Sequence, residues 1–141
     1  MERVALTNLF IGFCAIFLAA CAGSFLALDI TEGFIKNKDI LSSWQMINLK
    51  SAHGHTNLFG LCHIALGLTM PWSKLNQKIK KLQTIGLSMG TVAMSVLLSI
   101  QAFLGPSEDL TLLKITLGLF LSAALVSIAL QCYGLYVRLR R

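Results

Sequence analysis

The sequence has few charged residues for its length. Only 13% of its 141 residues are charged, 55% are hydrophobic, and the mean hydropathy is +0.72. Soluble domains are about one quarter charged, so this composition excludes an ordinary soluble domain. The chain is predicted to be an integral membrane protein whose main partner is the lipid bilayer.

Acidic residues are especially scarce, and none lies well inside an apolar stretch. A histidine that works as a general base in hydrolysis normally needs a carboxylate to orient it. The chain also lacks the phosphate-binding loop, the H-E-x-x-H helix and the G-x-G-x-x-G turn. A stand-alone enzyme is therefore not expected. The six acids are Glu2, Asp29, Glu32, Asp39, Glu108 and Asp109.

Cysteines are few and never form a C-x-x-C pair, which argues against a disulfide framework or a structural zinc site. Cys62, next to His63, stays a candidate soft metal ligand. An apolar run that ends at Cys21 imitates a lipoprotein signal, but apolar residues continue to Leu28, so we expect a retained membrane span. The four cysteines are Cys14, Cys21, Cys62 and Cys132.

Four apolar stretches can each form a membrane-spanning helix, which needs about 20 mostly apolar residues. They cover roughly residues 4–28, 50–70, 83–104 and 110–137. The connections leave little room for any other domain. The prediction is an all-α protein, a four-helix transmembrane bundle that forms a single domain over residues 1–141.

The distribution of lysine and arginine predicts the orientation of the bundle. If the N-terminus is cytoplasmic, eight of the twelve basic residues lie on the cytoplasmic side, which is the usual bias. Both termini are then cytoplasmic, and the protein is a multi-pass protein of the inner (cytoplasmic) membrane. Topology and anionic lipid account for the net charge of +6, so no nucleic-acid partner is expected. The eight are Arg3, Lys74, Lys78, Lys80, Lys81, Arg138, Arg140 and Arg141.

All three histidines, His53, His55 and His63, lie on the second predicted span. Ionisable side chains in a bilayer core are costly and point to function, and imidazole is a good ligand for haem iron and for copper. At about 100° per residue, His53 and His55 point to opposite sides of the helix. No two histidines can therefore bind one metal ion from this helix alone.

Small and polar residues accompany His53 on its side of the helix. Gly60 and Gly67 follow on nearly the same stripe, with Asn57 close by. A flat macrocycle could lie against this stripe, or a neighbouring helix could pack there. The sequence leaves both alternatives open.

His63 is predicted near the middle of the membrane, where its nitrogens need a partner. Met94 and Thr91 on the third span are at a matching depth. Met94 is also a candidate second ligand for a haem iron.

A second polar layer is predicted near the outer surface, where residues of all four spans reach similar depths. It could form the path of a small-solute or proton-coupled carrier through Asn57, Gln101 and Lys114, although Lys114 can instead extend to the lipid headgroups. The members of this layer are Ser24, His53, His55, Asn57, Ser99, Gln101, Lys114 and Thr116.

The H-x-H-x-N-L-x-G pattern of residues 53–60 resembles small four-helix membrane proteins related to subunit I of the haem-copper oxidases and nitric-oxide reductases. The resemblance implies that His53 or His55 is an axial haem ligand and that Asn57 and Gly60 belong to the motif. Complete subunits carry histidines on several helices. This chain has three on one helix and lacks the ligands of a binuclear centre, so it is not expected to be an oxidase.

The leading hypothesis is a membrane protein that binds a b-type haem, or alternatively copper, for electron transfer or for binding a diatomic gas. The cofactor would be held by a histidine of the second span with Met94, with water, or with a histidine of a second copy. Gly86-x-x-x-Gly90 on the third span gives modest support for a homodimer, and a larger membrane complex is also open. The alternatives are a carrier and a non-catalytic structural or assembly subunit.

Overall fold

The described residues fold into helices and contain no strand. In the computed structural model these residues are 2–37, 41–106 and 111–140. The predicted all-α class is confirmed, and each predicted span corresponds to a long helix. The elements are α1 (Arg3–Lys36), α2 (Ser43–Thr69), the 3-10 turn η1 (Met70–Trp72), α3 (Gln77–Val92), the π-helical segment η2 (Ala93–Leu97), α4 (Leu98–Leu104) and α5 (Thr111–Leu139).

Three of the helices are long and apolar enough to cross a membrane. They are α1, the continuous rod of α3, η2 and α4 over Gln77–Leu104, and α5. These helices fit a multi-pass membrane protein. The predicted second span, α2, has a comparable length of 27 residues but does not reach the same apolarity, because it carries the histidines and several amides and hydroxyls.

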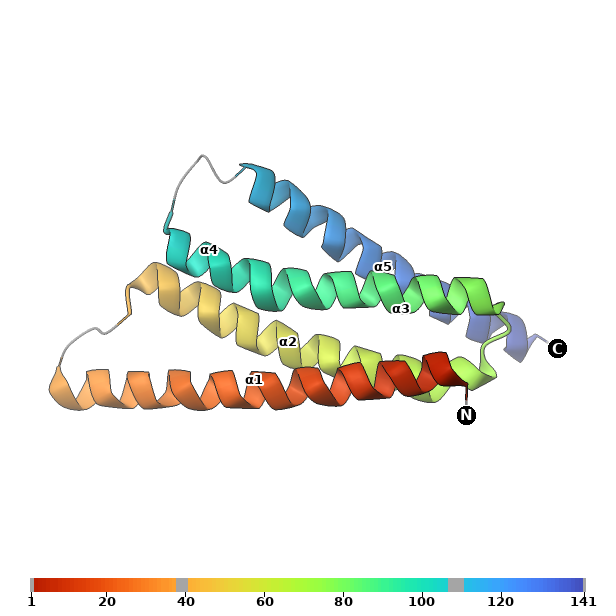
Figure 1. Cartoon of the computed structure of the whole chain (residues 1–141), viewed down its shortest axis with the longest axis horizontal. Helices are drawn as coiled ribbons and strands as arrows, with labels where there is room; N and C mark the ends of the chain where they lie inside the picture. Colours follow the sequence, from red (N-terminus) through yellow and green to blue (C-terminus); the bar gives the residue numbers. More distant parts are fainter. Residues whose placement is uncertain (1, 38–40, 107–110, 141) are drawn as a thin grey trace.

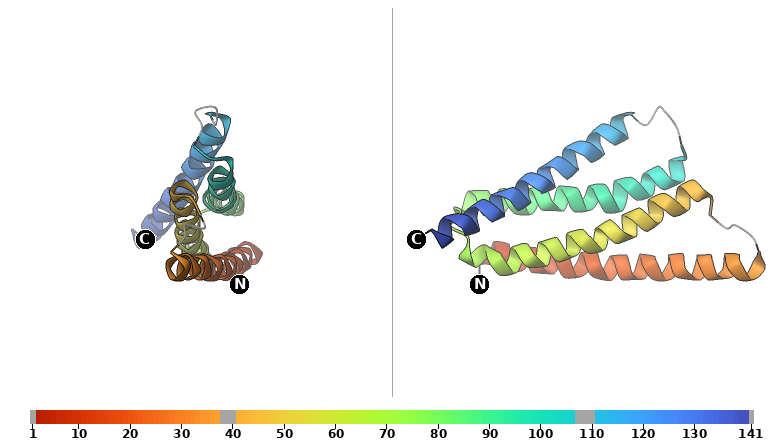
Figure 2. Two further views of the ribbon diagram at one scale, coloured as in Figure 1. Left: turned by 90° about the vertical axis from the view of Figure 1, so that its left-hand side faces the viewer. Right: turned by 180° about the vertical axis from the view of Figure 1, so that it is seen from behind.

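The helices pack side by side in the order α1, α2, the α3–α4 rod and α5 (Figures 1 and 2). α2 contacts α1 on one side and α3, η2 and α4 on the other. The polar helix is therefore shielded by more apolar ones. Figure 1 shows that the C-terminal half of α5 crosses α3. The N-terminal end of α5 diverges from α4. Both termini and η1 lie at one end of the molecule.

The first two helices extend further than the sequence predicts. The sequence suggests a connection over residues 29–49, but α1 continues to Lys36 and α2 begins at Ser43. At Asn37 the backbone turns left-handed with a φ of 48°, which ends α1. Ser42 and Gln45 form a reciprocal capping box that starts α2.

Glycines bring α1 and α2 into close contact. A Cβ atom at Gly12 would lie 2.7 Å from the Gly60 carbonyl oxygen, and a Cβ at Gly67 would lie 2.8 Å from the Ala5 carbonyl oxygen. Only residues without a side chain permit this approach of the two backbones.

The Gly86-x-x-x-Gly90 motif is used within the chain. A Cβ at Gly86 would meet the side chain of Ser127, and one at Gly90 would meet the Cβ of Ala124, both on α5. α5 therefore covers the face that the sequence offers as a dimer contact. The motif gives no support for a homodimer.

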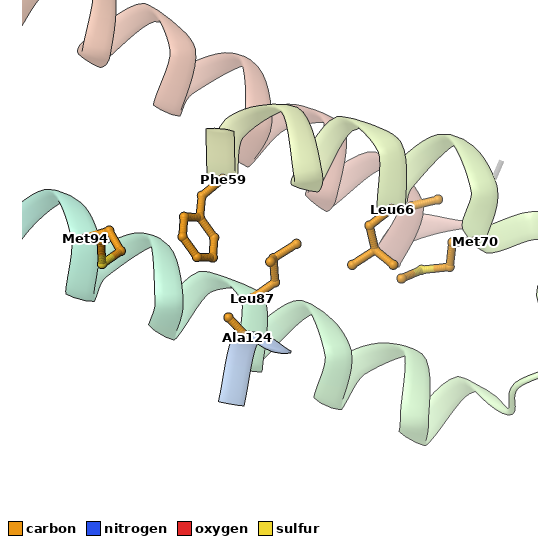
Figure 3. Close-up of a cluster of buried hydrophobic side chains, with 7 residues drawn as sticks. Phe59, Leu66, Met70, Leu87, Met94 and Ala124 are labelled. Atoms are coloured by element: carbon orange, nitrogen blue, oxygen red, sulfur yellow. The ribbon is translucent and has the colours of Figure 1, made fainter. Parts of the chain in front are cut away.

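A small apolar core lies between α2, the α3–α4 rod and α5. Figure 3 shows Phe59 and Leu66 facing Leu87, with Met94 beside Phe59. Met70 and Ala5 are fully buried at the end near the termini. This core holds α2, the α3–α4 rod and α5 together. Most other large apolar side chains are on the outer faces of the helices and are exposed, as lipid-facing residues are in the absence of lipid.

Candidate functional site

α2 places the three histidines in three different environments. His53 lies against α1, His55 bonds to its own helix, and His63 is fully buried in the core. Among the described residues, no three His, Cys, Asp or Glu side chains come together in a group that could hold a metal ion. Any iron or copper ligated by one of these histidines would thus draw its remaining ligands from elsewhere.

His53 is held tightly by α1. Its Nδ1 is 2.8 Å from the Ala19 carbonyl oxygen. The ring lies over Gly23, where a Cβ would be only 2.5 Å from the His53 Cε1 atom. Because a carbonyl oxygen can only accept, Nδ1 carries the hydrogen and Nε2 keeps its lone pair in the neutral ring. The Asn57 Nδ2 lies 3.5 Å from the His53 Nε2 and can donate to it.

His53 also lines an apolar groove of about 990 Å³ between α1 and the α3–α4 rod, with α2 as its floor. On α1 the lining runs from Phe10 to Asp29, a length of about 28 Å at 1.5 Å per residue. Most of the lining is aliphatic or aromatic. The polar or charged members besides His53 are Asp29, Thr56, Thr91, Ser95 and Ser99.

The hydroxyl groups in the groove are satisfied by their own helices. Thr56 donates to the Ala52 carbonyl, Ser95 to the Thr91 carbonyl, and Ser99 to the Ser95 carbonyl, over 2.6 to 2.7 Å. Ser95 belongs to the π-helical segment η2. Such segments shift the helix register and occur often at functional sites. The groove therefore offers an incoming molecule a nearly apolar wall with one imidazole ring in its lining, whose Nε2 has a long contact of 3.5 Å with the Asn57 amide.

His55 and Asn57 do not line the groove. His55 Nδ1 is 2.8 Å from the Ser51 carbonyl oxygen and 3.2 Å from the Ser51 hydroxyl. Asn57 donates from Nδ2 to the His53 carbonyl at 3.3 Å. Both residues are half-buried, and their contacts are local to α2.

His63 has a partner that sequence reasoning missed. Its Nδ1 is 2.8 Å from the Asn8 Oδ1 of α1, whereas the sequence offers Met94 or Thr91. The Asn8 Nδ2 also donates to the Thr84 hydroxyl at 2.7 Å. This polar cluster joins α1, α2 and α3 in the core. Asn8 is isolated in an apolar run, and an isolated amide in a predicted membrane span is the signal that could have found it.

A second buried contact joins α3, α5 and α2. Gln83 Nε2 donates to the Ser127 carbonyl at 3.1 Å and lies 3.3 Å from the Gln131 Oε1. Gln131 donates in turn to the Thr69 hydroxyl at 2.9 Å. Gln83 is fully buried. The amide nitrogens of Gln83 and Gln131 thus form hydrogen bonds between helices, which is a common use of polar residues within membranes.

Gly60 and Met94 serve packing in this structure. The stripe that runs from His53 through Gly60 and Gly67 is filled by α1, so a flat cofactor cannot lie along it. Met94 packs beside Phe59 in the core (Figure 3) and does not line the groove. Of the residues predicted to bind a cofactor, His53 alone lies in the lining.

The predicted outer polar layer is not assembled. Lys114 on α5 is exposed, and Ser24 on α1 is exposed and donates to its own helix at the Ala20 carbonyl. α5 diverges from the other helices at this end (Figure 1). The path through Asn57, Gln101 and Lys114 that a carrier would use is therefore not formed in this conformation.

Comparison of the chain with known protein families, with characterised proteins and with solved structures gives no match.

Proposed function

We propose that the chain is a multi-pass protein of the cytoplasmic membrane that binds one b-type haem through the Nε2 atom of His53. The observation that carries this proposal is the hydrogen bond from the His53 Nδ1 to the Ala19 carbonyl oxygen, 2.8 Å long. Histidines that bind metals almost always donate their other ring N–H to a carbonyl or carboxylate, which fixes the ring and frees the ligating nitrogen.

The groove beside His53 suits an apolar ring system. Its volume of about 990 Å³ is at the upper end of the roughly 300–1,000 Å³ of small-molecule sites. Aromatic and aliphatic side chains such as Phe25, Ile100 and Phe103 line it. Among the described residues, the lining contains one histidine and no methionine, so the groove offers a haem one imidazole and no thioether.

A bound haem would supply one-electron chemistry and, at the position without a protein ligand, binding of a diatomic gas. His53 would orient the ring, and the apolar walls would exclude water from it. Gas binding therefore suits the groove better than electron transfer through a doubly ligated iron. Copper remains the alternative metal, and metal analysis of the purified protein separates the two.

The test is the absorption spectrum of the protein purified in mild detergent. We expect a Soret band that His53→Ala abolishes. His55→Ala is the matched control, because among the described residues His55 bonds only to Ser51 and lies outside the groove, and its band should stay. A colourless protein, or a band that His53→Ala leaves unchanged, would refute the proposal.

A structural or assembly subunit is the second candidate, and two observations favour it. The contacts of His53 with Ala19 and Gly23 also pack α1 onto α2. Asp29 is the one charged residue among the described residues of the groove lining, and its carboxylate repels the carboxylates of a haem. If this candidate is right, His53→Ala lowers stability in a protein that carries no haem.

A further inference from the structure

A polar cluster lies in the core toward the end that holds the two termini, apart from the His53 groove. It consists of His63 on α2, Asn8 on α1 and Thr84 on α3. His63 and Asn8 are 0% exposed, and Thr84 is buried. His63 Nδ1 is 2.8 Å from Asn8 Oδ1, and Asn8 Nδ2 is 2.7 Å from the Thr84 hydroxyl.

The contacts of this cluster determine which His63 nitrogen carries the hydrogen. Asn8 Nδ2 donates to the Val4 carbonyl at 2.9 Å, and since a carbonyl only accepts, the amide nitrogen of Asn8 is on that side. The oxygen of Asn8 then faces His63 and must receive a hydrogen from Nδ1. A neutral imidazole has one N–H. His63 Nε2 therefore carries no hydrogen and is a hydrogen-bond acceptor in the core.

Two buried acceptors in this part of the core have no protein donor among the described residues. They are His63 Nε2 and Gln83 Oε1. The orientation of the Gln83 amide is fixed as well, because its nitrogen donates to the Ser127 carbonyl. Gln83 and Thr84 are consecutive on α3, so the two acceptors lie at a similar height in the core, on faces of α3 that are about 100° apart. An acceptor without a donor is costly in a dry interior.

We propose that this region binds internal water, with one water molecule donating to His63 Nε2 and water also donating to Gln83 Oε1. Water suits the region because it supplies two hydrogens and no net charge, and the nearest described ion pair, Lys80 with Glu2, is at the end of the bundle. Ordered internal waters typically satisfy such leftover polar atoms.

The hydrated site is connected to the end that holds the termini. The Thr84 hydroxyl donates to the Lys80 carbonyl at 3.1 Å, and the Lys80 ammonium is 3.0 Å from the Glu2 carboxylate. Polar groups thus lead from the surface to His63 in the core. The inference does not depend on haem binding at His53.

Solid-state NMR on the full chain in lipid bilayers, with ¹⁵N-labelled histidine and glutamine and ¹³C-labelled leucine, tests the proposal. We expect a protonated Nδ1 and an unprotonated, hydrogen-bonded Nε2 for His63. Magnetisation transfer from water should reach the His63 ring and the Gln83 amide but not the methyl groups of Leu87, which is 1% exposed in the same core. Replacing the buffer with D₂O should remove the transfer.

Asn8→Leu removes the acceptor of the His63 Nδ1 hydrogen, so both tautomers of His63 should appear. If this variant does not fold, the spectra of the wild-type protein are sufficient to test the proposal. The proposal is overturned if water transfers no magnetisation to His63, if Nε2 rather than Nδ1 carries the hydrogen, or if Leu87 and His63 receive equal transfer. The last result would mean that water penetrates the core without a specific site.

Discussion

At the scale of single residues, the polar side chains of the core are placed by partners that are distant in the sequence. His63 is bonded to Asn8, which is 55 positions away, and Asn8 to Thr84, which is 76 positions away. Each of these residues alone looks like a minor interruption of an apolar helix. Together they satisfy nearly all of their hydrogen bonds, as polar groups in a membrane must.

Lys80 and Glu2 form an ion pair that makes stability depend on pH. Lys80 is 4% exposed, and its hydrogen bond is the main reason why the pKa of Glu2 is lowered from its ordinary value. A carboxylate with a lowered pKa contributes stability above the pKa of the unfolded chain, about 4.3, and this contribution is lost as the pH falls through the lowered value.

Glu2→Gln should therefore lower the free energy of unfolding at neutral pH by about 1 kcal/mol, since part of the Glu2 side chain is exposed and solvent screens the pair. It should also flatten the pH dependence below about 4.3. Unfolding in detergent, followed by circular dichroism from neutral to acidic pH, measures both effects. The double variant Glu2→Gln with Lys80→Met should regain stability because no charge is left buried. Identical pH profiles for Glu2→Gln and the wild type would contradict the assignment.

At the scale of helices, glycines decide which pairs of helices come close. Gly12 and Gly60 allow close packing of α1 against α2. Gly86 and Gly90 allow close packing of α5 against α3. Gly118 on α5 differs from these, because a Cβ atom there would meet nothing within 4 Å. Gly118 can therefore serve as the control for a closely packed glycine such as Gly90.

Gly90→Ala should destabilise the protein by about 1–3 kcal/mol, the usual effect of an overpacked contact, because its new methyl group would meet the Cβ of Ala124 and lie 2.9 Å from Phe59 Cε1. Gly118→Ala should leave stability unchanged or raise it by up to about 1 kcal/mol, because alanine is the better helix former. Thermal unfolding of both variants in the same detergent compares them directly. Equal losses in the two variants would show that the α3–α5 contact is not packed as described.

At the scale of the whole molecule, a polar helix is surrounded by more apolar ones. α2 is the least apolar of the long helices and also the one that contacts α1, α3, η2 and α4. Its neighbours shield part of its polar surface from lipid, and that shielding makes a less apolar span tolerable. Both termini lie at one end (Figure 1).

The orientation of this bundle in the membrane is a prediction from its basic residues, and reporter fusions test it. A fluorescent protein fused after residue 141 should fluoresce, and alkaline phosphatase inserted after Gly105 should be active, because the second site is predicted to be outside the cytoplasm. The reverse result at both sites would place the termini outside.

The sequence by itself determined the helical class, the approximate positions of the four long helices and the fit of three of them to a membrane, because these follow from the length and apolarity of local segments. It also singled out His53, since a histidine in an apolar span is rare and costly. The tertiary structure alone decided that His53 lies in the groove wall while His55 and Met94 do not, and that Asn8 is the partner of His63. These facts depend on how the helices rotate and approach one another, and this is determined jointly by glycines and polar atoms on different helices.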